Sequence, residues 1–599
     1  MSGLNAMQSN IRTKERRTAI CSALILLLSF FLASPLQAAE PVEIVVTGIE
    51  GAALENVQEA LVLPSGPASE EKIDPAWLER FAKEAEADTK SALEPFGYYR
   101  AQVTVVSEPV RARYRVRVQV IPGEPARLTE VNVALAGAGR EERRLLRLVT
   151  RFPLQKGDVL LHQIYEEAKA TLKLRAKDLG YLDAEFPRHE IRVAASAATA
   201  SIDLLLDTGE KHYFGATKIG GAPDYPDSFL RRHLSYREGE VFSYPSLGET
   251  QLNLTNSERF KEVSVTPGTA GAEDPRVPVT VQLEPGPRIT LRPGIGYGTD
   301  TGARFTVRYR DLNLFHLGHE LNTGLYVAER LKALVTGYIL PDPRDIRSST
   351  TLQVNLQQEE TDTYDSRILA LELARNRSFG KGKLGTAYLK VQYEDYAVAG
   401  VESDSRLVLP GVRFTDDRYN NPIRPRRGSR YTLDLHGTHQ LLGSDTALVQ
   451  LLAEGSRLTR LPWRLSLHSR AKVGATLLSD PLSDIPPSLR FFTGGDQSVR
   501  GYSYKSLGPR DALGRVVGGK QLLVGSLELE RALFKKWGVS VFYDAGNSFN
   551  SLSDIALFHG AGVGLHYYTP VGAFNLSVAK PLWGDRKALH LHLTVGLQL

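Results

Sequence analysis

The strongest constraint on this chain is a long C-terminal stretch in which apolar and polar residues alternate. From about Ile289 onward, runs of roughly ten such residues are separated by Gly, Asp, Asn and Pro, and no helical periodicity is left. Strands of about ten residues with one apolar face are typical of barrels that cross a membrane. The pattern therefore predicts a membrane β-barrel of 16 antiparallel strands over residues 287–599. The sixteen runs begin near residues 289, 304, 319, 332, 349, 367, 383, 405, 429, 446, 464, 521, 538, 558, 571 and 590.

An array of soluble β-sandwiches is the alternative explanation of such alternation. The last run argues against it, because its apolar positions continue to the final residue, where a soluble sandwich would close with polar side chains. These positions are Leu591, Leu593, Val595, Leu597 and Leu599. The barrel is therefore the favoured fold.

The N-terminus has the pattern of an exported protein. Basic residues between positions 12 and 17 precede the apolar run 19–32, and small residues follow it. The run is shorter than the roughly 20 residues that a membrane-spanning helix needs. It favours a signal peptide over residues 1–38, cleaved after about Ala38. The single cysteine, Cys21, lies inside this segment, so the mature chain offers no thiol for a disulfide or a metal.

Composition and motifs exclude several classes of protein. A mean hydropathy of −0.21 excludes a bundle of membrane helices, and a net charge of +5 without a basic block gives no sign of nucleic-acid binding. The sequence contains no G-x-S-x-G, H-E-x-x-H or P-loop pattern, so we expect neither enzymatic activity nor a cofactor. His590 and His592 alternate with leucines and have no third ligand nearby, so we interpret them as lumen-lining residues and expect no metal site.

Between the signal and the barrel, one unit of sequence occurs three times. Each copy ends in a strand-like run with a turn glycine, at Gly123, Gly209 and Gly286. Earlier in each copy, a glycine or arginine beside an aromatic residue follows a helical pattern. Each unit is therefore predicted to run strand, helix, helix, strand, strand. The three predicted α+β domains span residues 41–122, 124–208 and 210–286.

One connection in the barrel region is much longer than the others, covering about residues 477–520. With the repeats on the periplasmic side, it is the sixth external loop. At its centre lies the sequence Val499-Arg500-Gly501-Tyr502, in which the glycine gives the backbone freedom to turn. A solvated surface arginine is the simplest interpretation of Arg500, but the strands that follow the loop favour another.

Alternation in these strands points three acidic residues, Glu528, Glu530 and Asp544, into the barrel lumen. Unpaired carboxylates in a confined space are costly unless a cation meets them. A planar guanidinium can bind two carboxylates at once. We therefore expect the loop to fold back into the barrel and to bring Arg500 to these acids.

These motifs together resemble a known family. The "GG…VRGY" loop, the "GSLE" strand and the "VFYDAG" strand are similar to the C-terminal half of the BamA/TamA superfamily, and the repeats resemble its periplasmic POTRA domains. Three repeats make the chain most similar to the TamA branch, because BamA-type proteins usually carry five and two-partner-secretion transporters two. The resemblance implies that Arg500 lies inside the barrel against Glu528 and Asp544. The inward position of Glu530 is predicted from alternation alone.

The resemblance also implies a function. It indicates an insertase or translocase subunit of the bacterial outer membrane, with periplasmic POTRA domains, that assists assembly or secretion of proteins such as autotransporters. The implied partners are a TamB-like periplasm-spanning inner-membrane protein, unfolded outer-membrane protein or autotransporter clients, and outer-membrane lipid. Alternatives are a two-partner-secretion-type polypeptide export channel and a general BamA-like assembly factor. A passive porin would not need three periplasmic domains.

The seam of the predicted barrel is its weakest point. The first strand contains Pro293, Gly294, Gly296 and Gly298, and the last strand contains Gly596. Proline removes a ladder donor, and glycines weaken a strand. We therefore predict a lateral gate between the first and sixteenth strands, at which a client strand could pair with an exposed edge.

The predicted topology can be tested on intact cells. Protease added outside should leave residues 40–286 uncut, because the outer membrane shields them, and should cleave external loops at most. An epitope in the repeats makes cleavage visible by immunoblot, and cells with a permeabilised outer membrane are the positive control. Loss of the repeats from intact cells would show that the topology is wrong.

Overall fold

The computed structural model describes residues 42–63, 75–110, 113–271, 274–421, 425–569, 572–582 and 589–596. The predicted signal peptide lies outside these residues. The chain forms two compact units, one extending to Tyr213 and including 241–243, the other comprising 214–240 and the chain from Tyr244. Within the described ranges, none of the helices combines the length and the apolar character needed to cross a membrane.

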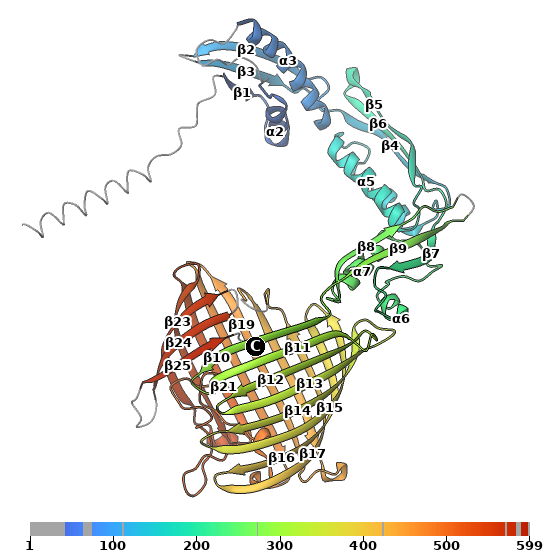
Figure 1. The fold of residues 1–599 in the computed structure, drawn as a ribbon. Coiled ribbons are helices and arrows are strands. Elements are labelled where there is room, and N and C mark those ends of the chain that lie inside the picture. Colours follow the sequence, from blue (N-terminus) through green and yellow to red (C-terminus); the bar gives the residue numbers. More distant parts are fainter. Residues whose placement is uncertain are drawn as a thin grey trace, which may run out of the picture. The chain divides into compact units, whose positions relative to one another are not determined.

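Three small sheets precede the barrel, and in each the chain runs strand, helix, helix, strand, strand, as predicted. In all three, the last strand lies between the other two, in the orders β1-β3-β2, β4-β6-β5 and β7-β9-β8 (Figure 1). The first sheet has β1 (Val42–Thr47), α2 (Gly51–Ala60), α3 (Pro75–Leu93), β2 (Gln102–Val110) and β3 (Arg113–Ile121). The second has β4 (Arg127–Ala136), α4 (Arg143–Thr150), α5 (His162–Asp178), β5 (Glu185–Ala194) and β6 (Thr199–Asp207). The third has β7 (Tyr213–Gly220), α6 (Asp227–Arg231), α7 (Tyr244–Thr255), β8 (Phe260–Pro267) and β9 (Arg276–Pro285).

Helix α3 shows how the repeated pattern produces this packing. Its side chains at a spacing of three to four residues, Leu78, Phe81, Ala85, Thr89 and Leu93, are all buried, and the four apolar ones belong to the core of the first domain. The chain leaves the helical segment at Gly97, whose φ of 87° lies in the left-handed region that favours glycine. The sequence periodicity therefore identifies the helix face that forms the core of this domain.

The remainder of the chain closes into a 16-stranded barrel in which every strand pairs antiparallel with its neighbours, which confirms the predicted fold class (Figure 1). Each strand begins within four residues of its predicted start. The first eight strands are β10 (Ile289–Gly298), β11 (Gly302–Leu314), β12 (His319–Ala328), β13 (Leu331–Pro341), β14 (Ser348–Glu360), β15 (Tyr364–Gly380), β16 (Lys383–Val398) and β17 (Val401–Asp417). The others are β18 (Gly428–Thr438), β19 (Leu448–Leu461), β20 (Leu465–Leu478), β21 (Gln521–Ala532), β22 (Trp537–Phe549), β23 (Phe558–Thr569), β24 (Gly572–Pro581) and β25 (His590–Gly596).

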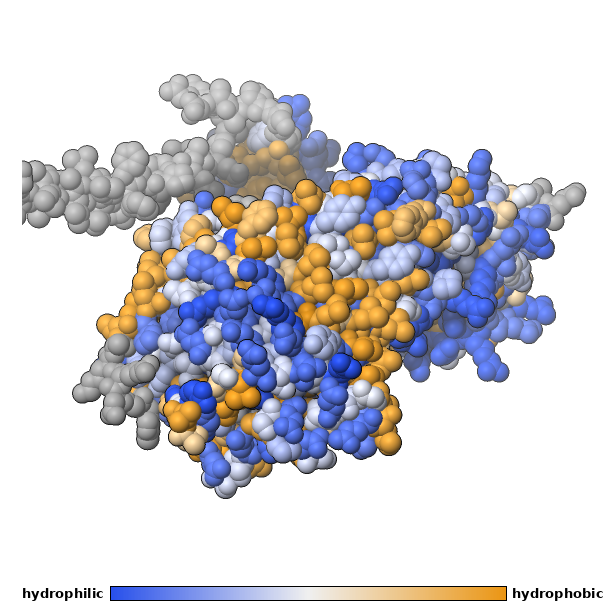
Figure 2. Space-filling model, turned by 60° about the horizontal axis from the view of Figure 1, so that its bottom comes forward, coloured by the Kyte–Doolittle hydropathy of each residue, from blue (hydrophilic) through white to orange (hydrophobic). Residues whose placement is uncertain are grey.

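The outer wall of the barrel is apolar. In β15, for example, Leu369, Leu371 and Leu373 are about half exposed, whereas Ala370 and Ala374 between and beside them are buried inside. Figure 2 shows hydrophobic side chains gathered in broad patches on the outside of the molecule, next to hydrophilic areas. So much exposed apolar surface is unfavourable in water and favourable in lipid.

The third small sheet is attached to the barrel by a buried arginine. Arg259 donates from Nε to the carbonyl of Leu312 (3.2 Å) and from a terminal nitrogen to the carbonyl of Gly318 (3.2 Å), at the turn between β11 and β12. Its guanidinium also lies over the ring of Phe229 and 3.8 Å from the carboxylate of Glu320. The side chain of Arg259 therefore donates hydrogen bonds to two backbone carbonyls and lies near one carboxylate at this junction.

We predict that Arg259→Met will loosen this junction while leaving the barrel closed. The substitution keeps an apolar stem but removes the hydrogen bonds to the carbonyls of Leu312 and Gly318, and a buried acceptor left unsatisfied costs about 1–3 kcal/mol. Amides of residues 213–286 should exchange with deuterium several-fold faster than in the parent protein. Arg276→Met, at an exposed arginine of β9, is the matched control. Equal exchange in the two variants would contradict a role of Arg259 at the junction.

Candidate functional site

The connection between β20 and β21, residues 479–520, enters the barrel. We call it loop 6, because it is the sixth connection at the end of the barrel opposite the third sheet. Its side chains Ile485, Leu489 and Val499 are buried, and Ile485 and Leu489 pack against the inward-facing Leu407 and Leu409 of β17. Loop 6 therefore occupies lumen space, as the sequence analysis expected of its arginine.

The motif Val499–Tyr502 makes a tight turn against the last strands of the barrel. Gly501 has a φ of 97°, and a side chain there would lie 3.1 Å from the backbone nitrogen of Pro581. The ring of Tyr502 packs edge-on against Phe558, with 5.5 Å between the ring centres. This position therefore requires glycine for both its dihedral angle and its close approach to β24.

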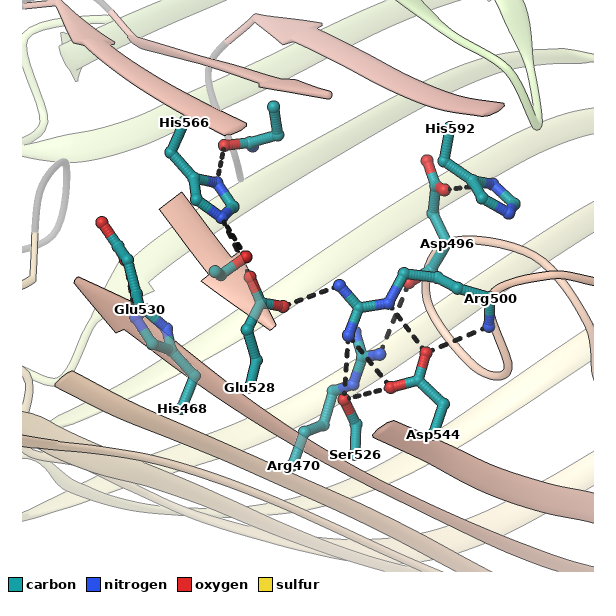
Figure 3. Close-up of polar contacts among 12 residues, drawn as sticks. His468, Arg470, Asp496, Arg500, Ser526, Glu528, Glu530, Asp544, His566 and His592 are labelled. Carbon is teal, nitrogen blue, oxygen red and sulfur yellow. Dashed lines mark hydrogen bonds and ion pairs between the residues drawn. The ribbon is translucent and has the colours of Figure 1, made fainter. Parts of the chain in front are cut away.

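Arg500 lies between the two acids to which the resemblance assigned it (Figure 3). Its Nε and one terminal nitrogen donate to the two carboxylate oxygens of Asp544 (2.7 and 3.0 Å), and its other terminal nitrogen donates to Glu528 (2.6 Å). Its backbone N–H also donates to Asp544 (3.1 Å), and the guanidinium lies over the ring of Phe542, 3.4 Å from its centre. Arg500 is 7% exposed and Asp544 is fully buried. The guanidinium forms the planar, forked contact that an ammonium group cannot reproduce.

Neighbouring polar groups complete this arrangement. Ser526, opposite Asp544 in the β21–β22 ladder, donates to Asp544 (2.6 Å). The second oxygen of Glu528 contacts His566 of β23 (2.9 Å). Each carboxylate thus has two or more partners, which lowers the cost of holding it away from bulk water.

Glu530 faces inward, as alternation predicted, but its partners are different. Its carboxylate contacts His468 of β20 (3.0 Å) and accepts a hydrogen bond from Tyr568 of β23 (2.9 Å). Glu530 therefore belongs to a separate contact with a neighbouring histidine, and Arg500 pairs with Glu528 and Asp544.

Two further contacts of loop 6 were missed in the sequence analysis. Lys505 and Tyr504 both bind Glu359 of β14, at 2.8 and 3.0 Å. Ser488 binds Glu394 of β16 through its hydroxyl group. Both acids occupy inward positions of their strands, so the alternation of the sequence could have identified them as lumen residues. No local sequence pattern predicts which residue of loop 6 contacts each acid.

The seam between β10 and β25 has a short ladder. Among the described residues, it consists of two register pairs, Tyr297–Val595 and Gly298–Thr594, whereas β10 and β11 share ten pairs and β24 and β25 share seven. All four predicted gate residues of β10 pair with β11, and in the described part of the chain only Gly298 of these four also pairs with β25. Gly596 pairs with Ala573 of β24.

Near the outer end of this seam, the structure brings Asp300 and Asp496 to His592. Asp300 lies in the β10–β11 turn, Asp496 in loop 6 and His592 on β25, and one potential ligand atom of each lies within 4.8 Å of the others. Alternation predicts that His592 lines the lumen, but no local pattern indicates the two acids beside it, because they are distant in the chain. Three such groups could in principle share a cation.

Comparison with known proteins finds two family models that match separate parts of this chain. Residues 313–598 match the Omp85 superfamily domain, and residues 43–122 match the POTRA domain described as TamA domain 1. The outer membrane protein assembly factor BamA of Nitratidesulfovibrio vulgaris is 23% identical over 427 residues, which is 68% of this chain and 53% of that protein. This chain therefore spans about half the length of that curated relative.

Solved structures share the fold at low sequence identity. BamA from Haemophilus ducreyi lacking POTRA domains 1–3 superposes with a TM-score of 0.64 at 17% identity, covering 79% of this chain and 99% of that one. CdiB from Escherichia coli gives a TM-score of 0.51 at 14% identity and covers 88% of this chain and 99% of that one.

We predict that Arg500 and Asp544 are energetically coupled. Arg500→Ala leaves two buried carboxylates close together, and breaking a buried pair typically costs about 3–5 kcal/mol, less in a partly hydrated lumen. A double-mutant cycle on thermal stability in detergent, with Arg500→Ala and Asp544→Ala, should give a coupling of about 1–3 kcal/mol. Arg500→Lys should restore little of the loss.

The control for this cycle is Arg515→Ala, which removes a more exposed arginine of loop 6 that pairs with Asp511. It should change stability by less than about 1 kcal/mol. Arg500→Ala should also make loop 6 more sensitive to protease. Strictly additive effects, together with an unchanged rate of loop cleavage, would mean that Arg500 does not anchor the loop.

Proposed function

We propose that this chain, which belongs to the Omp85 superfamily and lies in the bacterial outer membrane with its POTRA domains in the periplasm, is an insertase or translocase subunit. In this role it assists the assembly or secretion of outer-membrane proteins such as autotransporters. The work is non-catalytic: it uses strand pairing and binding in place of a chemical step. The observation that carries the proposal is the short ladder between β10 and β25.

The energetics of the seam support lateral opening. A backbone hydrogen bond contributes about 0.5–1.5 kcal/mol net in water, and an unpaired backbone group in lipid costs several kcal/mol. Separating two strands that share ten register pairs is therefore much more costly than separating β10 from β25, which share two among the described residues. An opened edge of β10 offers its unpaired backbone groups to an extended client strand.

The occupied lumen favours a lateral route over passage through the barrel. Loop 6 holds Arg500 against Glu528 and Asp544 on one side of the lumen and Lys505 against Glu359 on another. A polypeptide crossing through the lumen would have to displace these buried ion pairs. This argues for the insertase over the two-partner-secretion-type export channel.

The small sheets provide further binding edges. Among the described strands, β1 and β2 of the first sheet each pair with β3 and no other, so each has a long edge without a strand partner in that sheet. Extended segments can add to such an edge by main-chain hydrogen bonding. We propose that these edges receive unfolded clients or a TamB-like periplasm-spanning partner.

We predict that locking the seam stops client insertion. Tyr297→Cys and Val595→Cys place two thiols at a register pair, and opposed residues of antiparallel strands are close enough for a disulfide. The oxidised protein should remain folded and lose insertion of an autotransporter client in reconstituted vesicles. Reduction should restore the activity, and the native Cys21 lies in the predicted signal peptide.

The matched control carries Ile295→Cys and Phe305→Cys, a register pair of β10 and β11 that does not cross the seam. Its disulfide should leave insertion unchanged. Full activity of a protein whose seam is demonstrably locked would exclude the lateral gate.

A further inference from the structure

One residue of loop 6 contacts both sides of the seam. The backbone N–H of Asp496 donates to the carboxylate of Asp300 (2.7 Å), which lies in the turn at the end of β10. The carboxylate of Asp496 accepts a hydrogen bond from the hydroxyl of Thr594 (2.9 Å) and lies 2.6 Å from Nδ1 of His592, both on β25. Asp496 therefore links β10 to β25 through loop 6 (Figure 3 shows its contact with His592).

The contacts of Asp496 lie beside the two register pairs that join β10 to β25 in the described residues. Thr594 is itself the register partner of Gly298, and the N–H of Thr299 donates to the carbonyl of Leu593 (3.1 Å). Gly495, the residue before Asp496, allows loop 6 to lie close to the turn between β10 and β11. Gly495 has a φ of 99°, and a side chain there would lie 2.5 Å from the carboxylate of Asp300. Any other residue at this position would push the loop away from the turn.

We propose that Asp496 is a positioning residue that holds the seam closed. Opening β10 from β25 must break either its contact with Asp300 or its contacts with Thr594 and His592. The proposal rests on the proposed function, because a closing contact across the seam matters only if the seam opens. The proposal identifies Asp496 as the residue that determines how readily β10 separates from β25.

The protonation of His592 distinguishes this contact from a metal site. The N–H of Gly501 donates to Nε2 of His592 (3.1 Å), so Nε2 carries a lone pair and no proton. In a neutral imidazole the proton then lies on Nδ1, the atom beside the carboxylate of Asp496. A metal bound at Nδ1 would require the proton on Nε2, where it would meet the N–H of Gly501. Nδ1 therefore faces Oδ1 of Asp496 at 2.6 Å as a close polar contact, and in the described residues neither atom has a hydrogen-bond partner.

The same histidine connects this contact to the anchor of the loop. Gly501, which His592 binds, directly follows Arg500, whose guanidinium and backbone N–H bind Asp544. Between Asp496 and Gly501, loop 6 is therefore held by β25 at two points and by β22 at one. Displacing this segment weakens the seam and the Arg500 anchor together.

Burial and the nearby Asp496 raise the pKa of Asp300, in the turn outside the strands, to about 6. The titratable and charged groups around it are Asp496, His592 and Arg330. A raised carboxyl pKa means that the folded state binds the proton more tightly, so this contribution to stability is present below about pH 4 and is lost as the pH rises through about 6. At neutral pH, the two carboxylates repel each other across the seam, and the hydrogen bonds of Asp496 must offset this repulsion.

The test is amide hydrogen exchange at neutral pH on the full-length protein in detergent, followed in the seam segments 289–301 and 589–596. Asp496→Ala removes both side-chain contacts with β25 and should speed exchange in these segments roughly tenfold, since one hydrogen bond, to Thr594, and one close polar contact, with His592, are lost. Segments in β13 to β16 should not change. Asp496→Asn keeps one acceptor and should restore part of the protection.

Gln497→Ala is the matched control, because Gln497 is the exposed neighbour of Asp496 and contacts Arg470 instead of the seam. If Asp496→Ala does not fold, Thr594→Val removes one of the same contacts from the side of β25 and should give a smaller increase in exchange. Seam exchange that is unchanged in the folded variants would overturn the proposal.

Client insertion, measured in parallel, separates this proposal from the proposed function. Faster seam exchange supports the role of Asp496 even if the locked seam of Tyr297→Cys and Val595→Cys still inserts clients, a result that would refute the lateral gate alone. Unchanged seam exchange, combined with loss of insertion in the locked protein, would refute the role of Asp496 and leave the lateral gate standing.

Discussion

The absence of water from the lipid interior is the constraint on which the rest of this structure depends. Each backbone N–H and C=O in the membrane must find a partner inside the protein, and a sheet meets that requirement only by closing on itself. Ladders such as that of β16 and β17, with sixteen register pairs, satisfy it fully. The seam of β10 and β25 satisfies it least among the described strands. The same requirement that closes the barrel is therefore met by the fewest register pairs at this seam, among the described strands.

In the lumen the constraint is one of charge, because several acidic side chains point inward from the strands. Asp544, Glu528 and Glu359 would be costly in a confined space without cations, and loop 6 supplies Arg500 and Lys505. Neutralising these charges requires the loop to fold inward. The loop held inward occupies part of the lumen and brings Asp496 to the seam. Charge balance inside the barrel and closure of its wall are thus connected by one segment of chain.

The sequence analysis identified part of this site. Arg500, Glu528 and Asp544 were named from alternation and from a family resemblance, and the structure places them in contact. Glu530 was also expected to face inward and does, yet it pairs with His468. Asp300 and Asp496 were not identified. Nothing in their local sequence distinguishes them from other acidic residues in turns, and they lie 196 residues apart in the chain.

The sequence by itself determined the fold class, the number of barrel strands and the order of elements in each small domain. These features depend on periodicities of 2 and 3.6 residues, which record locally which face of each element is buried. The tertiary structure alone decided which loop residue contacts which strand, which residues of β10 and β25 pair in the described part of the seam, and that His592 lies between Gly501 and Asp496. Such contacts depend on the path of a long loop through the lumen. That path follows from the summed balance of charge, burial and backbone geometry over distant residues, and no local pattern contains it.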